Sequence, residues 1–306
     1  MQRRTYLIIA LVVVALLLAG ILIAPYSLKP STSSTSQVQI VAAENFWGSL
    51  ASQLGGTHAK VTSIVTNPNT DPHEYESNSA DAQAIANARL VIVNGAGYDT
   101  WALDLIAADN NPNQTVLNVQ KLIGQSIGAN PHFWYSPYYV NETVKAMYND
   151  LVAIDPKNTA YYTQQYISLN ASLETYNRRI DEIRQQFAGT PVASTESIFV
   201  YMANATGLDL VSPPAFMEAV AEGIDPPAQS IVQFQQLIQN GSIRVLVYNS
   251  QTITPLTENI ESMATQKGIR IVPITETVQP PNALFQDWMN AELTSIQNAL
   301  NSTALS

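Results

Sequence analysis

The chain of 306 residues contains no cysteine, which excludes disulfide bonds, thiolate metal ligands, thiol catalysis and a lipid-modified cysteine as a membrane anchor. Charged residues are also scarce: they make up 12% of the chain, about half of the usual share. Lysine and arginine total 14 against 24 acidic residues, and no basic run occurs. We therefore expect no nucleic-acid partner, because a protein of that class needs a basic surface to contact phosphates.

One long uncharged hydrophobic run lies near the N-terminus. The segment from Leu7 to Ala24 comes after Arg3 and Arg4. At ~1.5 Å per residue it would span about 27 Å as a helix, close to the hydrocarbon thickness of a bilayer. The positive charge before the segment predicts a transmembrane anchor with the N-terminus inside and the rest of the chain at the extracytoplasmic face of the membrane. A cleaved signal peptide is the alternative, and both interpretations export the remainder of the chain.

From Val38 onward, short β-branched runs alternate with helix-length segments, a pattern typical of parallel α/β sheets. The expected strands are Val38–Ala42, Val61–Val65, Leu90–Asn94, Thr115–Val119, Val192–Ser194, Arg244–Tyr248 and Arg270–Ile274. The expected helices are Phe46–Leu54, Ala80–Ala88, Ile198–Ala205, Ala228–Gln239, Leu256–Lys267 and Leu284–Leu300.

The stretch 158–187 contains neither proline nor glycine and predicts one helix of roughly 45 Å. The sequence therefore predicts an α/β fold with two similar lobes that carry parallel sheets and are joined by this long rigid helix. The expected divisions are a membrane anchor or signal segment (1–28), a Ser/Thr linker (29–37), an N-terminal lobe (38–157), the connecting helix (158–187) and a C-terminal lobe (188–306).

Histidine is rare, with three residues in the whole chain. Two of them stand in similar segments, Asp71-Pro72-His73-Glu74-Tyr75 and Asn130-Pro131-His132-Phe133-Trp134. A proline before each histidine stiffens the loop, which favours a fixed ligand over a mobile surface side chain. We interpret His73 and His132 as half of a metal site, although each could simply hydrogen-bond its own turn.

Two carboxylates complete the candidate site. Glu196 and Glu276 each stand two residues past an expected strand of the second lobe, and His73 and His132 also come after strands. All four therefore fall on loops at the carboxyl ends of parallel strands, where open α/β sheets bind their ligands. Two imidazoles and two carboxylates suit Zn²⁺ and Mn²⁺, and two ionised carboxylates neutralise such a dication.

Each carboxylate also has a simpler interpretation. Glu196 could cap the helix that comes after it, and Glu276 could be an ordinary surface residue. Asp225, which precedes two prolines, is the reserve fourth ligand. The third histidine, His58, comes after a Gly-Gly turn and is expected to face solvent.

These segments resemble the metal-specific solute-binding proteins of ABC transporters, the zinc/manganese family typified by the ZnuA and TroA receptors. The likeness covers nearly everything from Val38 onward and is clearest from Asp71 to Trp101 and around His132. The resemblance places the first two ligands on His73 and His132. It places the third on Glu196, at the family's spacing before four residues: Phe199, Tyr201, Gly207 and Leu208.

The fourth ligand of the family, usually an aspartate after the last strand, aligns on Thr275. We substitute Glu276, because it is the nearest carboxylate. The 249–251 segment, Asn249-Ser250-Gln251, is similar to the family's loop near the cleft, where side chains support the ligands.

The resemblance implies a monomer without enzymatic activity that captures Zn²⁺ or Mn²⁺ outside the membrane and delivers it to the permease of an ABC importer. Two alternatives stay open. Six Asn-x-Ser/Thr sequons and the Ser/Thr linker would suit a surface adhesion module. A metal-dependent hydrolase would need an open coordination position and a general base.

Overall fold

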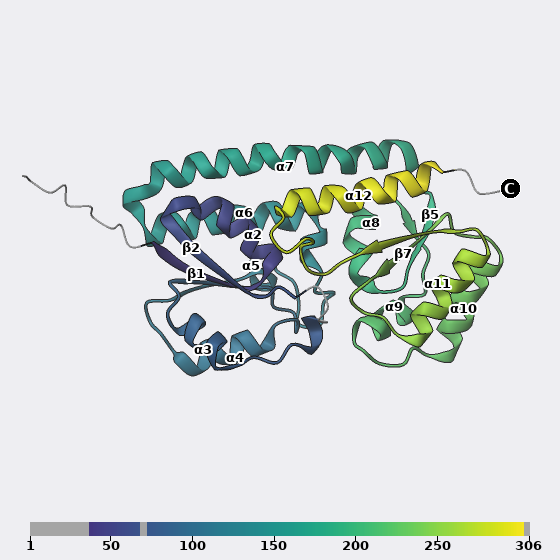
Figure 1. Cartoon of the computed structure of the whole chain (residues 1–306), viewed down its shortest axis with the longest axis horizontal. Coiled ribbons are helices and arrows are strands. Elements are labelled where there is room, and N and C mark those ends of the chain that lie inside the picture. Colours follow the sequence, from purple (N-terminus) through teal and green to yellow (C-terminus); the bar gives the residue numbers. More distant parts are fainter. Residues whose placement is uncertain (1–36, 68–71, 303–306) are drawn as a thin grey trace, which may run out of the picture. The chain divides into compact units, whose positions relative to one another are not determined.

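Figure 1 shows the computed structural model of the chain, which describes residues 37–67 and 72–302. These residues belong to one compact unit that begins at Gln37. The apolar segment Leu7–Ala24 and nearly all of the linker lie outside this part of the chain. Within it, none of the helices combines the length and the apolar composition that crossing a bilayer requires.

The first half of this unit, from β1 to α6, is built on a four-stranded parallel sheet with the strand order β2-β1-β3-β4. Its elements are β1 (Val38–Glu44), α2 (Asn45–Gly55), η1 (Gly56–His58), β2 (Ala59–Val65), η2 (Pro72–Glu74), α3 (Ser79–Ala86), β3 (Leu90–Val93), α4 (Thr100–Asp109), β4 (Thr115–Asn118), α5 (Val119–Leu122), η3 (Phe133–Tyr135) and α6 (Pro137–Ile154).

Both faces of this first sheet are covered, which explains why the central strand β3 is a continuous apolar run that is buried throughout. Side chains alternate along β1, so Ile40 and Ala42 join the large core that includes α2 and α6. Val41 and Ala43 point the other way, into a smaller cluster with residues of α3 and α4.

The second half, from β5 to α12, repeats the arrangement with the strand order β6-β5-β7-β8, again all parallel. Its elements are β5 (Pro191–Ser194), η5 (Ser197–Phe199), α8 (Val200–Thr206), β6 (Asp209–Leu210), α9 (Pro214–Ala221), α10 (Ala228–Gln239), β7 (Val245–Asn249), α11 (Pro255–Gln266), β8 (Arg270–Ile274) and α12 (Phe285–Asn301).

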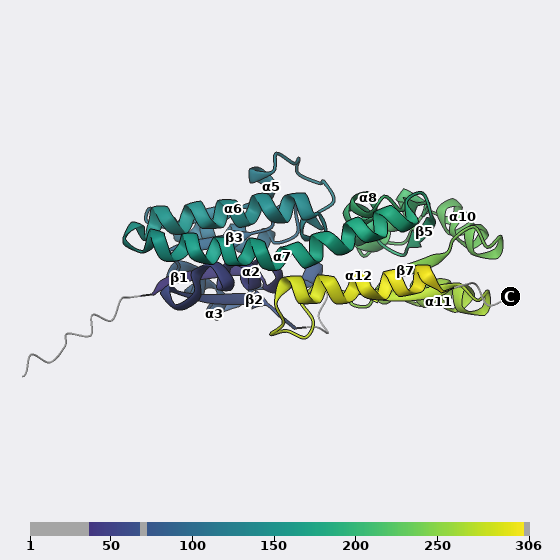
Figure 2. The ribbon, with the colours of Figure 1, turned by 90° about the horizontal axis from the view of Figure 1, so that it is seen from above.

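Between the halves, η4 (Pro156–Asn158) leads into the 29-residue helix α7 (Thr159–Phe187). This helix runs alongside α2 and α6 of the first half and then α8 and α12 of the second (Figures 1 and 2). Its buried residues recur at helical spacing and form one stripe: Tyr162, Leu169, Leu173, Tyr176, Ile180 and Ile183. The stripe belongs to a hydrophobic core that continues through both halves.

The predicted α/β class with two parallel sheets is confirmed. All expected strands are present, with ends shifted by at most two residues, because β-branched runs mark buried parallel strands clearly. The expected helix Ile198–Ala205 is instead the short turn η5 followed by α8. The sequence reasoning also missed β6, which has only two residues, and the helices α4, α5, α6 and α9.

Candidate metal centre

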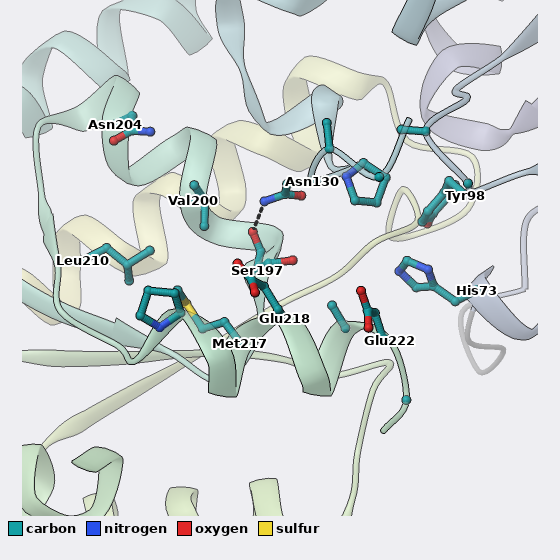
Figure 3. A pocket seen from close by; sticks show the side chains of 18 of the residues that line it. His73, Tyr98, Asn130, Ser197, Val200, Asn204, Leu210, Met217, Glu218 and Glu222 are labelled. Carbon is teal, nitrogen blue, oxygen red and sulfur yellow. Dashed lines mark hydrogen bonds between the residues drawn. The ribbon is translucent and has the colours of Figure 1, made fainter. Parts of the chain in front are cut away.

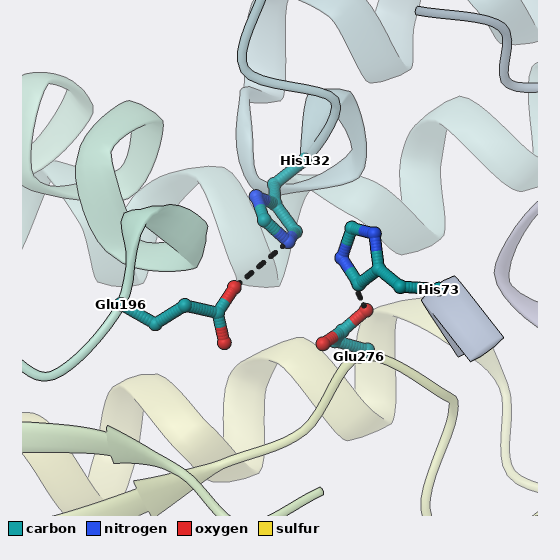
Figure 4. Close-up of side chains that lie close together, drawn as sticks. All are labelled: His73, His132, Glu196 and Glu276. Atoms are coloured by element: carbon teal, nitrogen blue, oxygen red, sulfur yellow. Dashed lines mark ion pairs between the residues drawn. The ribbon is translucent and has the colours of Figure 1, made fainter. Parts of the chain in front are cut away.

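The four side chains singled out from the sequence lie together (Figure 4). One ligand atom from each of His73, His132, Glu196 and Glu276 lies within 4.8 Å of all the others. Nε2 of His132 is 3.2 Å from Oε1 of Glu196, and Nε2 of His73 is 3.5 Å from Oε2 of Glu276. These two separations are close to the edge, roughly 3.3 Å, of a tetrahedron of donors that surrounds Zn²⁺ at about 2.0 Å.

The ends of the parallel strands explain how four distant residues meet. His73 lies in η2, on the segment that leaves β2, and His132 directly precedes η3 on the segment that leaves β4. Glu196 and Glu276 come after β5 and β8 of the second sheet. The carboxyl ends of the strands of both sheets therefore face the same point, and open α/β sheets bind their ligands at these ends.

The four residues differ in exposure. The side chain of His73 is 22% exposed, whereas those of His132, Glu196 and Glu276 are completely buried. A cavity of about 1030 Å³ opens beside His73 and Tyr98 and continues along α9 of the second half (Figure 3). His73 therefore lies where an ion would reach the buried donors.

The wall of this cavity is acidic. Glu74 of the first half and Glu218 and Glu222 of the second line it, and no lysine or arginine is found among the described residues that do so. A concave surface that carries one sign of charge concentrates counter-ions, so this wall attracts cations toward His73.

Asn130 fixes the ring of His132. Its Oδ1 accepts a hydrogen bond from the backbone N–H of His132 at 3.1 Å and lies 2.7 Å from Nδ1 of the ring. Its Nδ2 donates to the carbonyl oxygen of Ser197 at 2.7 Å, which settles the orientation of the amide (Figure 3). Nδ1 must therefore carry the imidazole proton, and Nε2, which faces Glu196, is the nitrogen suited to a metal ion.

Glu276 is fixed both through its backbone and through its carboxylate. The hydroxyl of Tyr98 donates to Oε2 at 2.7 Å, across the two halves. Oε1 of Gln251 accepts from the backbone N–H groups of Glu276 and Thr277, at 2.8 and 2.9 Å. The neighbouring Thr275 points elsewhere, because its Oγ1 accepts from Nε1 of Trp288 at 2.9 Å. This explains why Glu276, and not the aligned threonine, reaches the other three residues.

A buried carboxyl pair supports the turn that presents Tyr98. Burial and the neighbouring Asp99 raise the pKa of Glu44 well above its usual value, and burial raises the pKa of Asp99 to about 6. Asp99 accepts from the backbone N–H groups of Asn94 and Gly95 at 2.6 and 2.8 Å. Glu44 therefore holds its proton and hydrogen-bonds Asp99. Asp99 is the ionised member of the pair and organises the turn through its two backbone hydrogen bonds.

Two other residues considered from the sequence lie apart from the cluster. Asp225 is exposed on the loop after α9. His58 is half-buried in η1, where its ring packs edge-on against Tyr161 with the ring centroids 4.4 Å apart. His58 was expected to face solvent; the packing against α7 corrects that expectation.

Comparison with known proteins is consistent with this geometry. The family model described as "ZnuA: Zinc-uptake complex component A periplasmic" matches residues 40–299. The chain belongs to this family. The family membership predicted from the sequence is thereby confirmed.

Individual relatives of this ZnuA-family chain are distant. It is 28% identical over 188 residues to the manganese-binding lipoprotein MntA of Halalkalibacterium halodurans, a match that covers 57% of this chain and 59% of that protein. It is 25% identical over 199 residues to the manganese ABC transporter substrate-binding lipoprotein PsaA of Streptococcus pneumoniae, covering 58% of this chain and 62% of that one. Both matches thus span less than two thirds of the relatives' lengths.

A solved structure shares the fold. The periplasmic zinc-binding protein TroA from Treponema pallidum matches with a TM-score of 0.73 over 87% of this chain and 100% of that chain. The sequence identity is 16%, so this likeness concerns the fold alone.

Two side chains of this ZnuA-family site, Tyr98 and Asn130, carry roles that the sequence reasoning did not assign, and Asn249 lies in the segment that the resemblance placed beside the ligands. Tyr98 binds Glu276, Asn130 orients His132, and Asn249 lies between the two carboxylates. For Asn130 the available signal was its position directly before a Pro-His pair. The contact of Tyr98 depends on how distant loops meet, which no local pattern reveals.

Proposed function

We propose that this chain is a receptor that captures Zn²⁺ or Mn²⁺ at His73, His132, Glu196 and Glu276 and presents the ion to the permease of an ABC importer. The carrying observation is the convergence of two imidazoles and two carboxylates on one largely buried point. Two ionised carboxylates buried together without a counter-charge would be costly, and a bound dication neutralises both.

The number of donors supports binding rather than catalysis. Catalytic zinc sites keep one position for water or substrate, whereas four protein donors close a tetrahedral site. The matched relatives are named as binding proteins. Release of the ion, rather than a chemical step, is then the event that comes after capture.

The two halves act as lobes in this proposal: residues 38–157 come before the connecting helix in the sequence, and residues 188–306 come after it. Support comes from α7, which packs against helices of both halves, and from the hydrophobic core that continues between them. A long packed helix resists hinge bending, so we expect the lobes to move little when the ion binds.

We further propose that the receptor works as a monomer at the extracytoplasmic face of the membrane. The relatives are named lipoproteins, but this sequence contains no cysteine for a lipid. The uncharged segment Leu7–Ala24 would provide the attachment, with the N-terminus inside.

Calorimetry on the full chain in mild detergent, after removal of metal with a chelator, tests the proposal. Titration with Zn²⁺ and with Mn²⁺ is expected to show one ion per chain, and His73→Ala should weaken binding at least about 100-fold. His58→Ala is the matched control, because it removes a histidine remote from the cluster and should bind as the unaltered chain does. An unaltered chain that binds neither ion would refute the receptor function.

A further inference from the structure

Asn249 occupies a position from which it reaches both carboxylates. It is the last residue of β7, and this strand lies between β5 and β8, the strands that precede Glu196 and Glu276. Its side chain is almost completely buried, with 2% exposure. The carboxamide therefore lies at the carboxyl end of an inner strand, between the two loops that carry the acidic residues.

The carboxamide donates to both glutamates. Nδ2 of Asn249 is 2.5 Å from Oε2 of Glu196 and 2.6 Å from Oε1 of Glu276. Oδ1 accepts from the backbone N–H of Gln251 at 2.9 Å, so the nitrogen end of the amide must face the carboxylates. A carboxamide has two N–H groups, enough for these two short hydrogen bonds; Oγ1 of Thr252, at 3.0 Å, is a longer third contact of the same nitrogen.

The two oxygens of each carboxylate therefore have different partners. One oxygen of each is held by Asn249, and the other faces an imidazole: Oε1 of Glu196 lies 3.2 Å from His132, and Oε2 of Glu276 lies 3.5 Å from His73. The hydroxyl of Tyr98 also donates to Oε2 of Glu276, but an oxygen with two lone pairs can accept that bond and bind an ion.

We propose that Asn249 is a positioning residue that restricts each glutamate to one ligand oxygen and so sets the coordination number of the metal centre at four. This inference rests on the metal-binding function proposed above. For a glutamate to bind an ion through both oxygens, its carboxylate would have to turn until both oxygens face the ion, and this turn would strain the short charge-assisted hydrogen bond to Asn249.

A selectivity results from the coordination number. Zn²⁺ is satisfied by four nitrogen and oxygen donors in a tetrahedron, whereas Mn²⁺ prefers six donors in octahedral geometry. By preventing bidentate carboxylates, Asn249 denies Mn²⁺ two further oxygens from the protein. Asn249 thus increases the preference for Zn²⁺ over Mn²⁺, which the intrinsic affinities of the two metals already favour.

The test compares Asn249→Ala with Ser250→Ala in the full chain, purified in detergent and stripped of metal. Affinities for Zn²⁺ and Mn²⁺ are measured by competition with a chromophoric chelator. In Asn249→Ala we expect the ratio of zinc affinity to manganese affinity to fall about 10–100-fold, the effect typical of losing a partner of a metal ligand. Ser250 is the matched control, because it lies in the same loop and its hydroxyl donates to the carbonyl of Ile274 instead of a carboxylate.

Co²⁺ provides a direct readout of coordination number. Four-coordinate Co²⁺ absorbs visible light strongly and six-coordinate Co²⁺ weakly, so the unaltered chain should give the strong spectrum and Asn249→Ala the weak one. A weak, six-coordinate spectrum from the unaltered chain would overturn the proposal, even if Asn249→Ala did not fold.

The remaining outcomes separate the two proposals. Tight metal binding with an unchanged zinc-to-manganese ratio and an unchanged Co²⁺ spectrum in Asn249→Ala would overturn the role of Asn249 and leave the receptor function standing. An unaltered chain that binds none of the three ions would refute the receptor function, and this inference with it.

Discussion

At the scale of single residues, Glu292 of α12 links the two halves next to the proposed metal centre. Its carboxyl accepts from the hydroxyl of Tyr135 at 2.7 Å and from the backbone N–H of Thr275 at 2.9 Å. Nε1 of Trp288 also donates to it at 2.9 Å. Tyr135 lies three residues after His132 and Thr275 directly precedes Glu276, so Glu292 supports the segments that carry two of the proposed ligands.

This residue predicts a pH dependence of stability. Burial raises the pKa of Glu292 from 4.5 to about 7. Between these values the folded chain keeps a proton that the unfolded chain has lost, so the free energy of unfolding should fall as the pH rises through that window. Glu292→Gln should remove up to about 3 kcal/mol of this fall.

Urea denaturation of the metal-free protein at pH 5 and pH 7.5 measures the effect. Glu44 and Asp99 titrate in the same direction, but they are present in both proteins, and their contribution cancels in the difference between Glu292→Gln and the unaltered chain. If the free energy of unfolding changed by the same amount between pH 5 and pH 7.5 in the two proteins, the assignment to Glu292 would be contradicted.

The residue scale also shows how far the sequence defines the site. Rarity and the repeated Pro-His pair were enough to single out His73 and His132, and the position after a strand was enough to single out Glu196, all three of which lie in the observed cluster. Glu276 was chosen in place of the aligned Thr275 only because it is the nearest carboxylate in the sequence. The supporting contacts of Tyr98 could not be predicted, because they join residues 178 positions apart in the chain.

At the scale of elements, the segment between β8 and α12 belongs to the second half but is fastened to α2 of the first. Asn45 donates to the carbonyl of Val278 at 3.3 Å and accepts from its N–H at 2.9 Å. Ser49, one turn further along α2, accepts from the N–H of Phe285 at 3.0 Å. The segment that carries Glu276 is therefore held by both halves.

Removing this attachment should both destabilise the protein and loosen the site. Asn45→Ala breaks two buried hydrogen bonds and leaves the N–H and carbonyl of Val278 unsatisfied, so we expect a loss of about 1–3 kcal/mol in the free energy of unfolding. We also expect weaker metal binding, because Glu276 loses part of its support. Denaturation and calorimetry measure the two effects.

The control for that experiment lies on the same helix. Ser52 is exposed on α2, and Ser52→Ala should change stability by no more than about 0.5 kcal/mol. If Asn45→Ala were destabilised but bound metal with unaltered affinity, the attachment would serve only the fold.

Among the elements, strands were easier to predict than helices. Buried parallel strands are marked by β-branched runs, but α6 begins with Pro137-Tyr138-Tyr139, which resembles a loop until Ser136 is recognised as its cap and Pro137 as its first residue. Helix α9 has a similar start at Pro214. The two-residue strand β6 exists only through its pairing with β5, so no local signal could have revealed it.

At the scale of the whole described unit, α7 and the shared core predict a receptor that changes shape little. The core residues of α7 contact both halves, and Asn130 and Tyr98 add hydrogen bonds from the first half to the second. Opening the lobes widely would expose this apolar surface to water. Small-angle X-ray scattering of the metal-free and zinc-bound chain should therefore give nearly the same radius of gyration. A clear contraction on binding would show hinge closure and contradict the bracing role of α7.

The central claim is that donors from both halves hold one ion at a common point. Crystals of the metal-loaded chain, with diffraction measured at the zinc and manganese absorption edges, test it most directly. We predict one anomalous peak about 2.0–2.3 Å from His73, His132, Glu196 and Glu276. A peak bound by residues of one half alone, or two imidazoles turned away from the ion, would contradict it.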